Sequence, residues 1–197
     1  RGVTNGKKAK AVLSSYLKID RATLPKDQLA YFEQQTALFK VDSERNKVFT
    51  VQFENGTKKP LIATDRAGRS NNTFTFDIAE VQHLIKDNRI HFTIENDERA
   101  NCYALYSKDK GYLVISDIAD PIKNSYVLDT NTLLRNTFLH EPKIAKGMPE
   151  LFKQFQQDLE SPLFTYVSSS PIQLLPTLDQ FIAKNYPQGF IKLRQST

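Results

Sequence analysis

The first hundred residues begin with helical periodicity and then change to a β-type pattern. Residues 9–17 predict a short helix, and residues 25–39 predict a longer one, because apolar residues recur at three- and four-residue spacing from Leu29 to Phe39. Short runs rich in β-branched and aromatic residues follow, separated by turn residues such as Asn55-Gly56. These runs predict strands at 48–53, 61–64, 73–76, 91–95 and 102–106. We therefore expect residues 1–110 to form a β-rich region with a small antiparallel sheet or sandwich and a helix near 25–39.

The pattern changes again from Gly111. Residues 112–116 form a continuous apolar run closed by Asp117, as expected for a strand buried on both faces of a parallel sheet. Further strands are expected at 163–167 and 190–193, with helices at 131–139, 149–159 and 171–185. Alternating strands and helices predict an α/β fold with a parallel sheet and crossover helices. The boundary with the β-rich region is expected near residues 109–111.

Composition adds few constraints. With 197 residues, 40% of them hydrophobic and 25% charged, the chain is able to bury a core. A single cysteine, Cys102, excludes an internal disulfide framework and a zinc–cysteine cluster. No apolar run approaches the roughly 20 residues of a membrane span. We therefore expect a soluble chain without a transmembrane segment, and peripheral contact with a membrane stays open. The chain opens at Arg1 and not at Met, so its N-terminus does not reveal a compartment.

The net charge is +5 at pH 7, a mild excess of basic residues. Such a surface favours an anionic partner, which includes phosphate, a lipid headgroup or nucleic acid, although short lysine runs often mark only a solvated surface. No interleaved aromatic and basic residues of the RNA-binding kind are present, so no nucleic-acid partner is expected. The sequence does not predict the oligomeric state.

Polar residues of catalytic type follow two of the expected buried strands. Asp117 closes the first strand and Ser168 closes the second. In open parallel sheets, ligands collect at the carboxyl ends of the strands. An Asp in this position is able to attack phosphorus, and a Ser is able to hydrogen-bond the transferring phosphoryl oxygens. The alternative for Asp117 is a cap on the turn after the strand, and the alternative for Ser168 is that its neighbours only cap the helix that starts at Pro171.

Four sequence blocks, in order, resemble one known family. Residues 115–123 read I-S-D-I-A-D-P-I-K, where the family's first motif reads I-S-D-I-D-D-T-I-K. Residues 133–139 and 147–151 resemble the next two blocks, and residues 166–176 resemble the block Y-V-S-x-S-P-W-Q-L-Y-P. The chain thus resembles the phosphatidate phosphatases of the actin-patch type, whose catalytic domain is haloacid dehalogenase-like. The resemblance implies that residues 111–197 form the N-terminal part of such a Rossmann-type domain.

The same resemblance implies roles for individual residues. Asp117 matches the nucleophile, which also binds Mg²⁺ in the family. Ala119 stands where the family has a residue with two roles: its backbone carbonyl binds the metal, and its carboxyl group serves acid–base catalysis. In this chain the carbonyl is kept and the carboxyl group is lost. Such a group typically contributes about 10²–10⁴-fold to the rate. Ser168 matches the residue that holds a phosphate oxygen. Substrate-contacting roles, with structural or surface roles as alternatives, are expected for Lys123, Arg135, Asn136 and Ser170.

Departures from the family pattern leave two functional hypotheses open. The family's later motifs, a phosphate-binding Lys and acidic metal ligands, have no counterpart after the second motif, so the chain resembles a truncated domain. Ala119 fits both natural divergence and an introduced change, and Pro121 beside it favours divergence. The leading hypothesis is a Mg²⁺-dependent phosphatidate phosphatase-like hydrolase, acting through an aspartyl phosphate and impaired by Ala119. The alternative is a catalytically dead module that binds anionic phospholipid headgroups or an anionic membrane surface.

Overall fold

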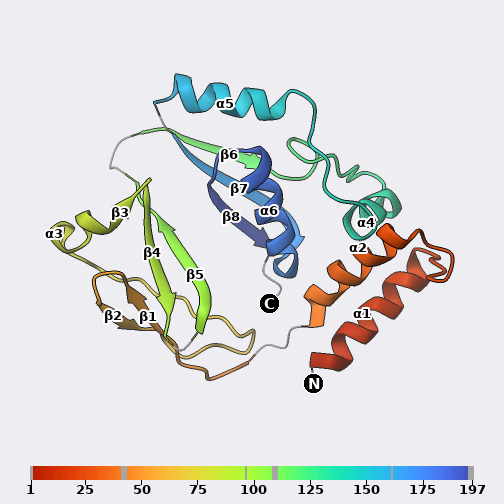
Figure 1. Ribbon diagram of the computed structural model, residues 1–197, viewed down its shortest axis with the longest axis horizontal. Coiled ribbons are helices and arrows are strands. Elements are labelled where there is room, and N and C mark those ends of the chain that lie inside the picture. The colour runs from red at the N-terminus through yellow and green to blue at the C-terminus, as the bar shows by residue number, and fades with distance from the viewer. Residues whose placement is uncertain (1, 41–43, 96, 108–110, 161, 195–197) are drawn as a thin grey trace. The chain divides into compact units, whose positions relative to one another are not determined.

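The computed structural model describes residues 2–40, 44–95, 97–107, 111–160 and 162–194 (Figure 1). By their internal contacts, the residues form two compact units: residues 1–42 join residues 111–196 in one unit, and residues 43–110 form the other. The N-terminal helices thus pack in the same unit as the C-terminal sheet. The expected domain division between 110 and 111 stays a prediction, and residues 109–110 of that boundary lie outside the described residues.

A parallel sheet with strand order β6-β7-β8 forms the centre of the first unit. Its strands are β6 (Leu113–Asp117), β7 (Leu163–Pro171) and β8 (Phe190–Arg194). The connections between strands contain the helices α4 (Thr130–Phe138), α5 (Met148–Asp158), η3 (Ile172–Leu174) and α6 (Leu175–Asn185). These elements confirm the prediction of an α/β fold with a partial, Rossmann-like parallel sheet.

Aromatic side chains dominate the core of this unit. Phe164 and Tyr166 are two residues apart on β7, so they share one face of the strand, and both are buried. Phe152 of α5 stacks on them, with ring centroids 5.8 Å from Phe164 and 6.0 Å from Tyr166. Tyr186 follows α6 and donates a 2.7 Å hydrogen bond to the carbonyl of Ile122. This bond fixes the loop after β6 to the core.

Strand β6 differs from the prediction that it is buried on both faces. Leu113 and Ile115 are 56% and 63% exposed, whereas Val114 between them packs against the core. The prediction was wrong because a continuous apolar run does not fix burial: the core packs against the face that carries Val114, and the face that carries Leu113 and Ile115 is exposed.

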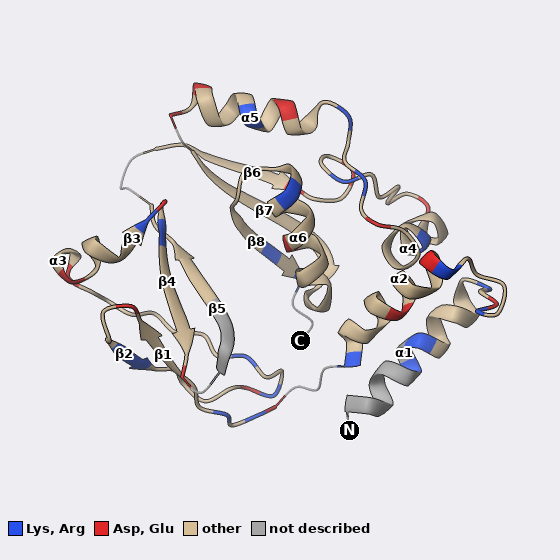
Figure 2. Ribbon diagram, viewed as in Figure 1, with Lys and Arg blue, Asp and Glu red and all other residues tan. Residues whose placement is uncertain are grey.

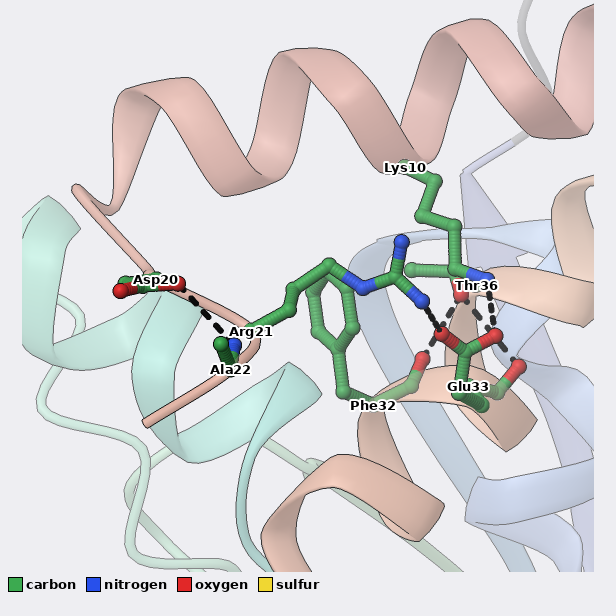
Figure 3. Close-up of polar contacts among 7 residues, drawn as sticks. All are labelled: Lys10, Asp20, Arg21, Ala22, Phe32, Glu33 and Thr36. Carbon is green, nitrogen blue, oxygen red and sulfur yellow. Dashed lines mark hydrogen bonds and ion pairs between the residues drawn. The ribbon is translucent and has the colours of Figure 1, made fainter. Parts of the chain in front are cut away.

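Two helices precede the sheet in the first unit: α1 (Gly2–Tyr16) and α2 (Lys26–Ala37), followed by the short η1 (Leu38–Lys40). They confirm both predicted helices, and α1 begins earlier than expected. Phe32 of α2 is fully buried in a cluster with Phe138 and Leu139. Figure 3 shows the carboxylate of Glu33 bonded to both Lys10 and Arg21, which joins α2 to α1 and to the connection between them.

An antiparallel sheet organises the second unit. Its elements are β1 (Thr50–Phe53), β2 (Lys58–Pro60), α3 (Ile78–Val81), η2 (Gln82–Leu84), β3 (Ile85–Lys86), β4 (Arg89–Ile94) and β5 (Asp97–Leu105). Strand β4 pairs with β1, β3 and β5, and β1 also pairs with β2. Gly56, with φ of 83°, makes the predicted turn after β1. The expected small antiparallel sheet is therefore confirmed.

Two predicted strands of this unit are absent from the described structure. Residues 61–64 and 73–76 form no strand, although Leu61, Phe74 and Phe76 pack against the core. In the first segment, side chains satisfy the backbone: Asn72 accepts from the amide of Ile62, and Ser70 donates to its carbonyl. Several apolar side chains of the two segments therefore reach the core as expected, although neither segment forms a regular strand.

Basic and acidic side chains are interspersed over both units (Figure 2). Five ion pairs join described residues, among them Lys58 with Glu95 and Lys86 with Glu54. Within the described residues, no helix combines the length and the apolar character needed to cross a membrane.

Candidate active site

The structure brings Asp117 and Ser168 to the same edge of the parallel sheet. Asp117 is the last residue of β6 and lies opposite Val167 of β7, so Ser168 comes one residue further along the neighbouring strand. The backbone continues this pairing beyond β6, because the amide of Ile118 donates a 2.9 Å bond to the carbonyl of Val167. The carboxyl ends of two adjacent strands therefore carry these two residues at one edge of the sheet, and their joint role in a site stays a prediction.

The carboxylate of Asp117 is exposed and held by the turn that follows it. Its Oδ1 accepts a 3.1 Å hydrogen bond from the amide of Ala119. Ile118 between them is almost fully buried in the core, which anchors the turn. The Ala119 side chain is a methyl group, so this position supplies no proton donor or acceptor beyond its backbone. Asp117 thus has a fixed orientation, and its second carboxyl oxygen makes no hydrogen bond within the described residues.

Asp120 organises the next turn of the loop. Its carboxylate accepts three backbone hydrogen bonds, from Ser125 at 2.8 Å, Tyr126 at 2.7 Å and Val127 at 2.9 Å. The bond from Val127 is the largest of the effects that hold the pKa of Asp120 below its usual value. The carboxylate is therefore bonded to the loop and does not replace the group missing at Ala119.

Lys123 is buried, so the alternative of a solvated surface lysine is wrong. Its ammonium group donates a 2.9 Å hydrogen bond to the hydroxyl of Ser125, which is itself fully buried. Burial lowers the pKa of Lys123, and the nearby Asp120 carboxylate acts in the opposite direction. The backbone of Lys123 also pairs with Ala119 and Ile144. Lys123 thus supports the loop after β6 from inside, and its predicted contact with a headgroup stays a prediction.

Ser168 and Ser170 form a small hydroxyl cluster at the end of β7. The Ser168 hydroxyl donates to Ser170 Oγ at 3.0 Å and accepts from the Ser170 amide at 3.1 Å. The pairing of β7 with β8 shifts register between Ser168 and Pro171, where the strand gives way to η3. Both residues are partly exposed. This cluster offers hydroxyl donors beside Asp117, which a phosphate group requires.

Arg135 and Asn136 lie on α4 and not on the strands that carry Asp117 and Ser168. Asp129 caps this helix by accepting from the amide of Asn131. Among the described residues, no hydrogen bond or ion pair joins Arg135 or Asn136 to Asp117 or Ser168. Asn136 lines a cavity of about 270 Å³, whereas Arg135 is exposed. The structure therefore shows no contact of these two residues with Asp117 or Ser168, and their contact with substrate stays a prediction.

Comparison with known proteins agrees with this geometry. Residues 112–197 match the model of the family described as phosphatidate phosphatase APP1, catalytic domain. The segment 112–197 is thus similar to the catalytic domain of this family. The chain is also 39% identical over 95 residues to the phosphatidate phosphatase APP1 of Saccharomyces cerevisiae. The match covers 47% of this chain and 16% of the yeast protein, so the chain spans only a small part of its relative.

The described residues offer few ligands for a metal ion. No group of three or more His, Cys, Asp or Glu side chains among them is arranged to hold a metal. At the strand edge, the oxygen donors are the Asp117 carboxylate and the backbone carbonyl of Ala119. Mg²⁺ is commonly held through one or two carboxylates together with substrate phosphates and water. The binding of Mg²⁺ by these two oxygens stays a prediction.

The sequence analysis missed the structural partners of the loop after β6. Asn124 donates from its amide to the carbonyl of Lys143 at 2.9 Å, and Ala145 donates to Ile122 at 3.0 Å. Segment 143–145 thus pairs with residues 122–124 and supports the turn that carries Asp120. A possible signal was the Asp-Pro pair at 120–121, because Asp side chains often accept from backbone amides further along a turn.

Proposed function

We propose that the chain carries part of a phosphatidate phosphatase site, in which Asp117 is the nucleophile. The observation that carries this proposal is the exposed Asp117 carboxylate at the end of β6, which accepts a hydrogen bond from the Ala119 amide, with Ser168 on the adjacent strand. The match of segment 112–197 to the family's catalytic domain supports phosphatidate, a phosphomonoester, as the substrate class. The proposal includes dependence on Mg²⁺, held by Asp117 and the Ala119 carbonyl, which neutralises phosphate charge when bound.

The proposed reaction has two displacements at phosphorus. A carboxylate oxygen of Asp117 forms a bond to phosphorus while the bond to the diacylglycerol oxygen breaks, giving an aspartyl phosphate. The leaving alkoxide takes a proton. Water then attacks the aspartyl phosphate, loses a proton and restores the Asp117 carboxylate as inorganic phosphate departs. Ser168 donates a hydrogen bond to a phosphoryl oxygen in both steps.

Ala119 makes both proton transfers slow in this proposal. Its methyl group neither gives a proton to the alkoxide nor takes one from water, and Asp120 is bound to three amides of the loop. Solvent must then supply and accept the protons. We therefore propose that the chain turns over slowly or not at all.

The first test restores the missing carboxyl group. We expect Ala119→Asp to release phosphate from phosphatidate, with Mg²⁺ present, about 10²–10⁴-fold faster than the parent chain. Phosphate release is measured with and without EDTA, and EDTA is expected to abolish it. Adding Asp117→Asn to the Ala119→Asp chain is expected to remove the gain, which assigns it to the nucleophile. If Ala119→Asp releases no phosphate, the proposed hydrolase function is wrong for this chain.

Loss of the acid–base group also favours a second candidate function. A site that keeps Asp117 and Ser168 but lacks a proton donor suits a module that binds anionic phospholipid headgroups without hydrolysing them. The same assay separates the candidates. Retention on phosphatidate vesicles with no phosphate release from either the parent or Ala119→Asp supports the binding module.

A further inference from the structure

Three consecutive apolar side chains project from the loop between β6 and α4. Tyr126, Val127 and Leu128 are 61%, 44% and 101% exposed, and we call these three residues the apolar tip. Single exposed apolar residues are common on proteins, but a contiguous exposed group marks a contact with a protein or a membrane. Leu128 is as exposed as a side chain in an extended peptide, so nothing in the described chain covers it.

The apolar tip is held in place by the loop beneath it. The carboxylate of Asp120 accepts from the amides of Tyr126 and Val127, and Asp129 donates from its amide to the carbonyl of Tyr126 at 3.0 Å. Asp120 and Tyr126 both have positive φ angles, of 72° and 59°. Such angles are costly for residues other than glycine and persist only where surrounding bonds enforce them. The loop therefore presents the apolar tip in one fixed conformation.

Basic residues lie on the segment that pairs with the start of this loop. The side chain of Asn124 donates to the carbonyl of Ile144 at 3.2 Å, and its amide donates to the carbonyl of Lys143. Lys143 and Lys146 are exposed and make no ion pair within the described residues, and Ile144 is exposed between them. Tyr126 and Lys143 line one cavity together with the exposed Glu141, and the Asp129 carboxylate caps α4. The segment 143–146 thus adds two exposed lysines and the exposed apolar side chain of Ile144.

We propose that the apolar tip inserts into the surface of an anionic lipid bilayer, with Lys143 and Lys146 contacting the headgroups. Apolar side chains with a neighbouring basic cluster are the pattern by which peripheral proteins bind membranes. Tyrosine suits the interface because its ring is apolar and its hydroxyl is polar. This inference deepens the proposed function and rests on it for its biological setting. Phosphatidate is a membrane lipid, and Asp117 begins the loop that carries the apolar tip.

The test uses the full chain and vesicles that offer no phosphomonoester. Phosphatidylcholine vesicles with or without phosphatidylserine are mixed with the protein in EDTA, and the bound fraction is measured by flotation. We expect the parent to bind the vesicles that contain phosphatidylserine and to bind neutral vesicles much less. Leu128→Asp is expected to weaken binding about tenfold or more, because one leucine leaves the bilayer. Lys143→Gln with Lys146→Gln is expected to weaken binding to the anionic vesicles alone.

A matched control guards against a general effect of the new charge. Ile62 is 61% exposed in the other unit, so Ile62→Asp makes the same kind of change elsewhere and is expected to bind like the parent. Equal binding by Leu128→Asp and the parent overturns the proposal. Failure of the parent to bind anionic vesicles also overturns it. In either case a protein partner is the better occupant of the apolar tip. Since phosphatidylserine is not a substrate for Asp117 chemistry, neither result decides the hydrolase function, which the Ala119→Asp assay tests separately.

Discussion

Asp120 and Ala119 are neighbours in the loop after β6, and they affect different properties of the molecule. Ala119 contributes an amide that orients Asp117 and no side-chain chemistry. Asp120 contributes a carboxylate that fixes the backbone over residues 125–127. The sequence was able to predict the chemical deficit at Ala119, because residue identity alone decides it. The structural role of Asp120 was not predictable, since it depends on where the chain returns five to seven residues later.

The role of Asp120 is testable by a nearly isosteric change. Asp120→Asn replaces a charged acceptor with a weaker one, and we expect the free energy of unfolding to fall by about 2 kcal/mol, since hydrogen bonds to charged groups exceed neutral ones. We also expect faster hydrogen exchange at the amides of residues 125–127. Urea unfolding and amide exchange measure the two effects. Asp158→Asn, at the exposed end of α5, is the control, and equal behaviour of the two variants contradicts the role given to Asp120.

At the scale of elements, apolar spacing predicted which segments carry buried side chains better than it predicted backbone pairing. Helix α2 was predictable because Phe32 and Thr36 recur at helical spacing and are both buried. The strands β6 and β7 were predictable because each ends an apolar run at a polar residue. The burial of β6 and the backbone pairing of residues 61–64 were not predictable, because both depend on neighbouring segments. Strand β6 lies at a sheet edge. The side chains of Ser70 and Asn72 bind the backbone of Ile62.

The contact between α1 and α2 predicts that the free energy of unfolding depends on pH in the acidic range. The hydrogen bond from Lys10 is the main cause that holds the pKa of Glu33 below its ordinary value of 4.5, and Arg21 adds to it. A carboxyl group whose pKa is lower in the folded state stabilises the fold fully above the unfolded pKa, and this stabilisation is lost as pH falls through the folded-state pKa. We therefore expect Glu33→Gln to be less stable than the parent at neutral pH, with the difference shrinking below about pH 4.5.

Urea unfolding of the two proteins from pH 7 to pH 3 checks this expectation. Glu160→Gln changes a carboxylate that makes no ion pair among the described residues, so its difference from the parent is expected to be small and nearly constant with pH. A constant difference for Glu33→Gln as well contradicts the coupling of Glu33 to Lys10 and Arg21.

At the scale of the whole molecule, the chain has two units with separate cores. Phe53 contacts both Phe76 and Phe92 in the antiparallel unit, whereas Phe152 stacks on Phe164 and Tyr166 in the parallel unit. Sequence was able to indicate the change of pattern near Gly111. It did not indicate that residues 1–42 pack with the C-terminal segment, because no local pattern records contacts between segments so distant in the chain.

Separate cores predict separate unfolding. Phe53→Ala is expected to cost its own unit about 3–5 kcal/mol and to remove amide protection in residues 44–95. Protection in residues 111–160 is expected to stay near that of the parent. Phe152→Ala is expected to give the reverse pattern. Hydrogen exchange followed along the chain distinguishes these results, and loss of protection in both units from either change shows a single cooperative domain.

The open edge of β6 has a consequence for handling the protein. Leu113 and Ile115 are exposed on a strand that pairs on one side within the described residues, and such strands offer unpaired backbone groups to other molecules. Raising the protein concentration therefore favours edge-to-edge aggregation, while mutual repulsion from a net charge of +5 is modest and is screened further by salt. Rates and binding curves measured on dilute samples thus report the single chain, and those from concentrated stocks include its clusters.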